Sequence, residues 1–200
     1  MIAIVDYGMG NLRSVQKALE KVGATAVVTD NPEIIKKSTK IVLPGVGAIA
    51  PAMEKLKSLN LVDPIKNAIS SNKPFLGICL GLQLLFDQSD EGGVIETLGI
   101  IPGSVIRFKD LKVPHMGWNQ ISIKQDQCSL FRNIDSGSNV YFCHSFFVKP
   151  KNDSFIATTT NYGLNFTSSI SKNNIFGVQF HPEKSQDIGL KILENFNNLK

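Results

Sequence analysis

One cysteine in this chain has the neighbours that nucleophilic chemistry needs. Cys79 is the centre of Gly-Ile-Cys-Leu-Gly at residues 77–81, between an apolar run and a helix-forming run. Glycines two residues before and after it permit a sharp strand-to-helix turn that holds the thiol strained and exposed. A helix start favours thiolate, and the Leu80 N–H is free to stabilise an oxyanion. We predict that Cys79 is a nucleophile, although a buried cysteine between packing glycines has the same pattern.

A base for this thiol is offered by Phe-His-Pro-Glu at residues 180–183. Pro182 biases His181 toward an extended conformation, and residues two apart in an extended segment face the same side. Glu183 can therefore hold one imidazole nitrogen and leave the other for Cys79, as in a nucleophile, base and orienter triad. Surface loops also contain this tripeptide. The order Cys, His, Glu argues against the α/β-hydrolase plan, in which the acid precedes the histidine.

A second glycine turn lies in Val-Leu-Pro-Gly-Val-Gly-Ala at residues 42–48. The carboxyl ends of parallel strands gather at one edge of an open sheet, so this loop and the Cys79 turn can border one crevice. An oxyanion donor from this loop would be worth on the order of 10² to 10³ in rate. A plain connection between a strand and a helix would explain the loop equally well.

Residue spacing gives little support to metal or cofactor sites. The three cysteines (Cys79, Cys128, Cys143) form no CxxC pair, and the three histidines (His115, His144, His181) form no HxxxH or HExxH pair. Arg13 occupies the third glycine position of a GxGxxG motif, which argues against a dinucleotide loop. We therefore predict no metal, no disulfide framework and no cofactor.

Composition indicates an ordinary globular chain. Its 200 residues are 42% hydrophobic and 19% charged, which predicts one domain over residues 1–200. The net charge is +4 without a basic run, so we expect no nucleic acid partner. Neither a membrane-length apolar stretch nor a signal-peptide pattern is present, so we expect no membrane partner and a cytoplasmic location.

The elements that must position these residues alternate in the first half of the chain. Short apolar runs predict buried parallel strands at residues 2–5, 26–28, 41–43 and 75–78, and helical spacing predicts helices through 12–22, 53–59 and 61–69. Later, β-branched alternation predicts mixed or antiparallel strands at 105–108, 120–123, 141–148, 155–160 and 175–180, before a final helix through 188–196. We predict a three-layer, doubly wound α/β fold, mainly parallel with antiparallel additions.

Three motifs in order resemble the signature of the class I, triad-type glutamine amidotransferases. They are Pro-Gly-Val-Gly at 44–47, Gly-Ile-Cys-Leu-Gly-Leu-Gln-Leu-Leu at 77–85 and Phe-His-Pro-Glu at 180–183. Segments 6–15, 113–119, 141–146 and 181–185 narrow the resemblance to the glutaminase subunits of imidazole glycerol phosphate synthase, over essentially the whole chain. The resemblance implies a flavodoxin-like fold and hydrolysis of glutamine to glutamate and ammonia, through a thioester on Cys79.

The resemblance also implies roles for further residues. By position, the glutamine pocket would be lined by Gly47, Gln83, His144 and Ser145, with oxyanion donors from Leu80 and the Val46 region. Positions that face the partner would be Asn11, Trp118, Tyr141 and Lys184. The partner implied is a separate (β/α)8 cyclase, which forms a heterodimer with the glutaminase. It uses the ammonia to make imidazole glycerol phosphate and aminoimidazole carboxamide ribotide in histidine biosynthesis.

Val46 leads to an expectation about regulation. An oxyanion donor must point its N–H inward, and β-branched Val46 occupies the place where a second glycine would ease rotation of the peptide. We therefore expect weak glutaminase activity in the isolated chain and higher activity once the partner binds its ribotide.

Three alternative functions stay open on the sequence alone. The chain can be a paralogue that feeds ammonia to a sugar-modifying partner in surface polysaccharide synthesis. It can also be a non-catalytic regulatory subunit, which the intact triad argues against, or a free-standing hydrolase of another acyl substrate.

Overall fold

Five parallel strands form the centre of the molecule. In the computed structural model, which describes residues 1–199, they are β1 (Ile2–Val5), β2 (Ala26–Thr29), β3 (Lys40–Gly45), β4 (Phe75–Cys79) and β14 (Ile175–Val178). Their order is β2-β1-β3-β4-β14, and each neighbouring pair is parallel. This is the flavodoxin-like order of a doubly wound sheet, so the predicted fold class is confirmed.

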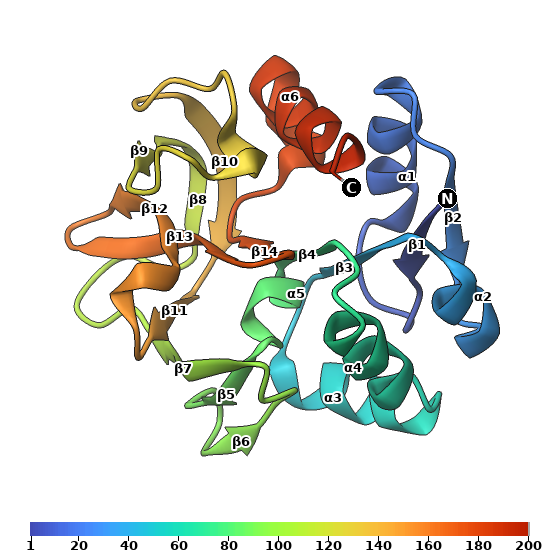
Figure 1. Ribbon diagram of the computed structural model, residues 1–200. Coiled ribbons are helices and arrows are strands. Elements are labelled where there is room, and N and C mark those ends of the chain that lie inside the picture. The colour runs from blue at the N-terminus through green and yellow to red at the C-terminus, as the bar shows by residue number, and fades with distance from the viewer. Residues whose placement is uncertain (200) are drawn as a thin grey trace.

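Helices cover both faces of this parallel sheet (Figure 1). Helices α1 (Leu12–Lys21) and α6 (Gln186–Asn197) lie on one face, and α2 (Pro32–Lys37), α3 (Ile49–Ser58) and α4 (Val62–Ser70) lie on the other. Successive side chains of a strand point to opposite faces. In β1, Ile2 and Ile4 therefore join the cluster under α1 and α6, whereas Ala3 and Val5 join the cluster under α2, α3 and α4.

The sheet continues beyond β14 with mostly antiparallel strands. In order they are β13 (Asn165–Lys172), β11 (Phe146–Pro150), β7 (Ile101–Arg107), β5 (Phe86–Ser89) and β6 (Ile95–Glu96). Off this path, β12 (Ile156–Asn161) pairs with β13, and β9 (Ser122–Ile123) pairs with β12. Strands β8 (His115–Gln120) and β10 (Asn139–His144) pair separately. The shortest helical elements are α5 (Leu80–Gln83) and the 3-10 turns η1 (Ser129–Phe131), η2 (Asp153–Phe155) and η3 (Pro182–Lys184).

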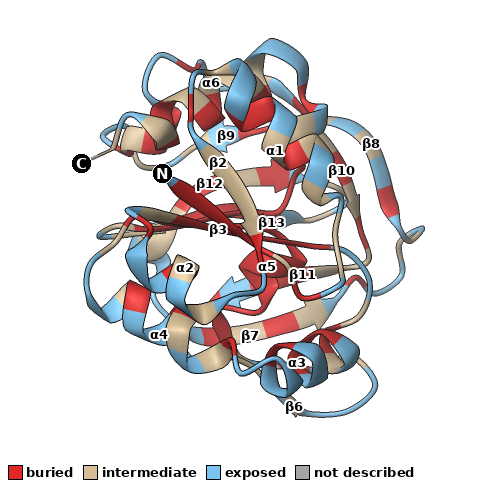
Figure 2. Cartoon of the chain, turned by 90° about the vertical axis from the view of Figure 1, so that its right-hand side faces the viewer, coloured by how far each residue is buried: buried red, intermediate tan, exposed pale blue. Residues whose placement is uncertain are grey.

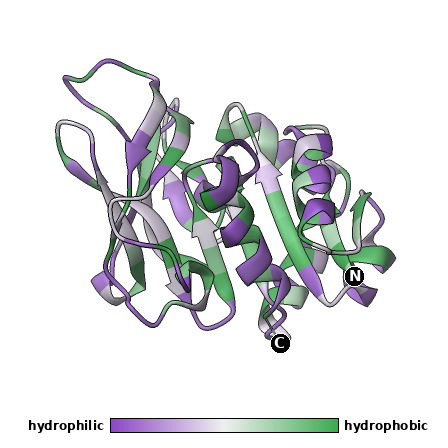
Figure 3. Cartoon of the chain, turned by 90° about the horizontal axis from the view of Figure 1, so that it is seen from above, coloured by the Kyte–Doolittle hydropathy of each residue, from purple (hydrophilic) through white to green (hydrophobic). Residues whose placement is uncertain are grey.

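Burial follows these layers. The central strands are enclosed, and β1 and β4 are buried along their whole lengths, whereas the helices expose their outer sides (Figure 2). The hydropathy of the residues follows the same layers: the central strands are largely hydrophobic, and the helices around them carry many hydrophilic residues (Figure 3). Within residues 1–199, no helix is long and apolar enough to cross a membrane.

The second half departs from the predicted strands where the chain bends. Residues 141–148 form two strands in different sheets, β10 and β11, because the chain turns at Ser145. The Phe146 carbonyl accepts hydrogen bonds from His144 and Gln83, and these bonds fix the bend. Residues 120–123 are likewise divided between β8 and β9, and strand β13 was not predicted.

Candidate active site

Cys79 ends strand β4 at a sharp turn. Its φ is 54° and its ψ is −106°, a conformation that few side chains adopt. Strained backbone of this kind is typical of nucleophile turns. Helix α5 begins at Leu80, whose N–H has no acceptor within the helix. The helix has four residues, so few aligned peptide dipoles lie behind the thiol.

The glycines around Cys79 allow backbone segments to touch. A Cβ at Gly81 would lie 1.7 Å from the Leu43 carbonyl oxygen, and one at Gly77 would lie 2.6 Å from the Gly81 carbonyl oxygen. Backbone atoms cannot swing aside as a side chain can. The turn therefore depends on both glycines for steric reasons.

Gly81→Ala is expected to lower the free energy of unfolding by about 3 kcal/mol, because the added methyl overlaps the backbone of β3. Urea unfolding followed by circular dichroism measures the change. Gly137→Ala is the matched control, because Gly137 has a φ of +94° but open space around an added Cβ. Its cost should be limited to backbone strain of about 1–2 kcal/mol. Equal losses in the two variants would contradict the steric account.

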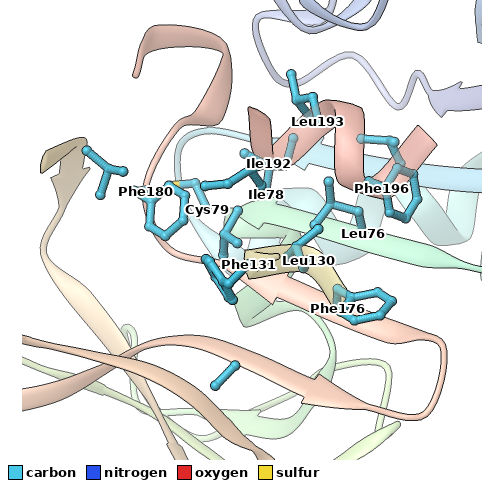
Figure 4. Packing of buried hydrophobic residues seen from close by; sticks show 14 of the residues in the cluster. Leu76, Ile78, Cys79, Leu130, Phe131, Phe176, Phe180, Ile192, Leu193 and Phe196 are labelled. Atoms are coloured by element: carbon cyan, nitrogen blue, oxygen red, sulfur yellow. The ribbon is translucent and has the colours of Figure 1, made fainter. Parts of the chain in front are cut away.

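The thiol is enclosed rather than exposed, which corrects the prediction. Cys79 is 6% exposed and belongs to the apolar cluster beside Ile78 and Phe180 (Figure 4). Its sulfur donates to the Cys143 carbonyl at 3.9 Å and accepts from the Gln179 amide nitrogen at 3.6 Å. The enclosure arises because Cys143 of β10 and Gln179, which follows β14, both reach the end of β4.

His181 and Glu183 contact each other beside this thiol. The His181 Nδ1 lies 2.8 Å from the Glu183 Oε1, and the two side chains are 4% and 2% exposed. His181 is extended as predicted, but Pro182 to Lys184 form the 3-10 turn η3 rather than an extended segment. Proline suits the first position of such a turn, and the turn carries Glu183 back to the imidazole.

The proton affinity of His181 is raised by its two neighbours. Burial lowers its pKa, but hydrogen bonds and negative charge from Cys79 and Glu183 outweigh burial and raise the pKa to about 10. His181 can therefore take the proton of the Cys79 thiol. A protonated imidazole next to the nucleophile is the acid that a departing amine requires.

The predicted pocket residues lie around the Cys79 turn. Gly45 is the register partner of Cys79, so the loop with Val46 and Gly47 adjoins the thiol. The Gln83 amide nitrogen donates to the carbonyl of Phe146 at 3.0 Å and to Gln179 Oε1 at 3.1 Å.

His144 and Ser145 lie at the bend between β10 and β11. The Nδ1 of His144 donates to the Phe146 carbonyl at 2.8 Å, and its Nε2 lies 3.0 Å from the His115 Nδ1. Both ring nitrogens of His144 are thus used inside the protein.

Two buried polar residues near Cys79 were missed by sequence reasoning. Tyr7 donates its hydroxyl to the Pro44 carbonyl at 2.9 Å, and burial, together with the Cys79 charge, raises the pKa of Tyr7 above its usual range. Gln179 contacts the sulfur directly. The position of Gln179, two residues before His181 in an apolar strand, would have placed both side chains on one face.

The class I glutamine amidotransferase family matches residues 3–198 of this sequence. This chain belongs to that family. The chain is 53% identical to the imidazole glycerol phosphate synthase subunit HisH of Geobacter metallireducens, over 98% of this chain and 96% of that protein. Identity to the subunit of the same name from Syntrophotalea carbinolica is 52%, over 100% of each chain.

Solved structures support the fold of this amidotransferase. A crystal structure of a glutamine amidotransferase has a TM-score of 0.78 at 14% identity, covering 100% of each chain. The structure of PurLQS from Thermotoga maritima has a TM-score of 0.75 at 19% identity, covering 98% of this chain and 97% of that one. Together with the strand order, these likenesses establish the doubly wound architecture.

Three of the predicted partner-facing residues gather on the surface of the amidotransferase. The ring of Trp118, which is 48% exposed, lies 6.1 Å from the Tyr141 ring, and the Lys184 Nζ lies 5.7 Å from the same ring. The carbonyl of Tyr141 also accepts from the His181 N–H at 2.9 Å, so this surface cluster adjoins the triad. Asn11 is exposed in front of α1 and, among the described residues, makes no capping bond to that helix.

A pair of buried histidines supports the site from β8 and β10. His115 and His144 are register partners, and the His115 Nε2 lies 3.2 Å from the Asn119 amide nitrogen. Because the Phe146 carbonyl can only accept, His144 carries its proton on Nδ1. His115 then donates from Nδ1 and accepts from Asn119. Burial lowers the pKa of His144 to about 3 and that of His115 to about 4, so both rings are neutral.

This neutral pair predicts acid sensitivity. The folded pKa of His144 lies below the usual 6.5, so its contribution to stability is present above pH 6.5 and is lost as the pH falls toward 3. In His144→Asn, an amide that does not titrate can replace Nδ1 as donor to Phe146. The slope of unfolding free energy against pH between 6.5 and 4 should become shallower by up to about 1.4 kcal/mol per pH unit. Urea unfolding at several pH values measures the slope, and an unchanged slope would contradict this account.

Among residues 1–199, no group of three or more His, Cys, Asp or Glu side chains is placed to hold a metal ion.

Proposed function

We propose that this amidotransferase hydrolyses glutamine with Cys79 as nucleophile, His181 as acid and base, and Glu183 as the group that orients His181. The observation that carries the proposal is the 2.8 Å contact of His181 with Glu183 next to a strained thiol. The contact fixes the imidazole, and the strained turn fixes the sulfur. A nucleophile, a base and an orienter in this order are what acyl transfer to sulfur requires.

In the proposed reaction, the Cys79 sulfur attacks the side-chain carbonyl carbon of glutamine. The resulting oxyanion is held by the Leu80 N–H and by an N–H from the Val46 loop. As the carbon–nitrogen bond breaks, His181 gives its proton to the departing ammonia. Water, deprotonated by His181, then attacks the thioester and releases glutamate and the free thiol.

We further propose that the chain is the glutaminase subunit of imidazole glycerol phosphate synthase. Two relatives named imidazole glycerol phosphate synthase subunit HisH, about half identical over essentially the full length, support this assignment. The partner would be the (β/α)8 cyclase, which uses ammonia to make imidazole glycerol phosphate and aminoimidazole carboxamide ribotide in histidine biosynthesis. Exposed apolar side chains (Val46, Met116, Trp118) offer that partner a surface. Three free cysteines favour action in the reducing cytoplasm.

This function is tested by measuring glutamate release in three mixtures. They contain the chain alone, the chain with the cyclase, and the chain with the cyclase and its ribotide. We expect slow release from the chain alone and the fastest release with the liganded cyclase, because Val46 hinders rotation of its peptide into the oxyanion hole. Equal turnover in all three mixtures would overturn the regulated function. Complementation of a histidine auxotroph separates this function from that of a paralogue in surface polysaccharide synthesis.

A further inference from the structure

We propose that Gln179 is a further catalytic residue, whose side-chain amide donates to the Cys79 sulfur and stabilises negative charge on it. Gln83 holds the Gln179 amide in the required orientation. The inference rests on the proposed role of Cys79 as nucleophile. It adds a donor that the triad does not include.

The orientation of both amides follows from one carbonyl. The Phe146 carbonyl can only accept, so the group of Gln83 that contacts it at 3.0 Å must be the NH₂. That nitrogen also lies 3.1 Å from the Gln179 side chain, which must therefore turn its oxygen toward Gln83. The NH₂ of Gln179 is then directed to the Cys79 sulfur, at 3.6 Å. A flipped Gln179 amide would place two NH₂ groups against each other.

Burial makes this donor effective. Gln179 is 0% exposed, and its backbone N–H donates to the Ser168 carbonyl at 2.8 Å, so the residue is fixed at the end of β14. A hydrogen bond to a charged group in a buried site is stronger than one to a neutral group. The amide of Gln179 can therefore discriminate between the thiol and the thiolate of Cys79.

The two polar groups on the sulfur act in opposite directions. The Cys143 carbonyl, 3.9 Å away, accepts from the thiol and favours the protonated form, whereas the Gln179 amide favours the ionised form. When the proton passes to His181, the contact with Cys143 becomes repulsive and the contact with Gln179 strengthens. Gln179 thus remains a partner of the sulfur in its reactive state.

Gln179→Met tests this role, because methionine has a similar length but no amide donor. The rate at which iodoacetamide alkylates Cys79 at a fixed neutral pH should fall about ten- to a hundredfold, as expected for loss of a hydrogen bond to a charged group. The kcat for glutamine should fall by a similar factor, with KM changed less than about twofold because glutamine binding does not use this contact. Unchanged alkylation, or a rise in KM with unchanged kcat, would overturn the proposal.

The matched control is Thr160→Val, which removes a buried hydroxyl that has no hydrogen-bond partner within residues 1–199. In this variant, the rate of Cys79 alkylation and the kcat for glutamine should equal those of the wild type. If both fell as far as in Gln179→Met, the losses in the two variants would come from general disturbance of the fold. Alkylation needs neither glutamine nor a partner. Slower alkylation of Gln179→Met therefore supports the role of Gln179 even if the proposed pathway is wrong.

A measurement on the wild-type fold covers the case in which Gln179→Met does not fold. The side-chain amide resonances of Gln179, assigned by their nuclear Overhauser contacts with Gln83, are compared between the wild type and Cys79→Ala. Loss of the sulfur acceptor should shift the Gln179 amide protons. Identical resonances in the two proteins would overturn the proposal.

Discussion

Cys79→Ala is expected to lower glutamate release by at least about 10⁴-fold, because loss of the nucleophile removes the covalent route altogether. Neither other cysteine can replace it. Cys143 presents its carbonyl to the Cys79 sulfur, and Cys128 lies in the apolar core, where burial raises the pKa of its thiol. Glutamate release with the liganded cyclase present measures the loss.

Cys128→Ala is the control for that variant. It removes a thiol of the same type without touching the Cys79 turn, so its turnover should equal that of the wild type. Residual activity of Cys79→Ala above about one-hundredth would mean that water attacks glutamine directly, since a missing nucleophile costs far more than this in related triads. That outcome would exclude the thioester route.

Glu183→Gln is expected to lower kcat/KM by about 10³- to 10⁴-fold, by analogy with loss of the orienting carboxylate in a serine triad. The imidazole loses both its fixed orientation and the charge that supports its proton. In addition, the Glu183 Oε2 is buried without a partner among the described residues, so the new NH₂ has no acceptor there. Steady-state kinetics measures the loss.

The pH dependence of Glu183→Gln has a defined sign. In the wild type, His181 has its pKa raised from 6.5 to about 10, so its contribution to stability is present below pH 6.5 and is lost as the pH rises through 10. Without the carboxylate, the pKa of His181 falls. The wild type should therefore exceed the variant in unfolding free energy most below pH 6.5, and the difference should shrink at alkaline pH.

Glu194→Gln is the matched control, because Glu194 pairs with Lys191 at 2.7 Å on the surface. Loss of such an exposed pair should change stability by less than about 1 kcal/mol and leave turnover unchanged. If Glu183→Gln kept kcat/KM within tenfold of the wild type, the carboxylate would not orient the base.

Local steric rules explain what the sequence predicted well. The glycines at 77 and 81 are required by backbone contacts within a few residues of Cys79 and across one strand pair, so their spacing reveals the turn. The contact of His181 with Glu183 also spans two residues. The contact is present, but a 3-10 turn rather than an extended strand makes it, because proline suits both conformations.

Long-range pairing explains what the sequence did not show. The thiol is enclosed because Cys143 and Gln179, 64 and 100 residues away along the chain, meet at the end of β4. The neutral His115–His144 pair likewise depends on the register of β8 with β10. Apolar spacing carries no information about such registers, and it also hides the bend at Ser145 that divides one predicted strand into two.

The most direct test of the central claim is to trap the nucleophile. The amidotransferase with its liganded cyclase is incubated with 6-diazo-5-oxo-L-norleucine, a reactive glutamine analogue, and its peptides are analysed by mass spectrometry. We predict a single adduct on Cys79, formed more slowly when glutamine competes, and no adduct on Cys128 or Cys143. An adduct on another residue, or continued glutamate release with Cys79 unmodified, would contradict the assignment of Cys79 as the nucleophile.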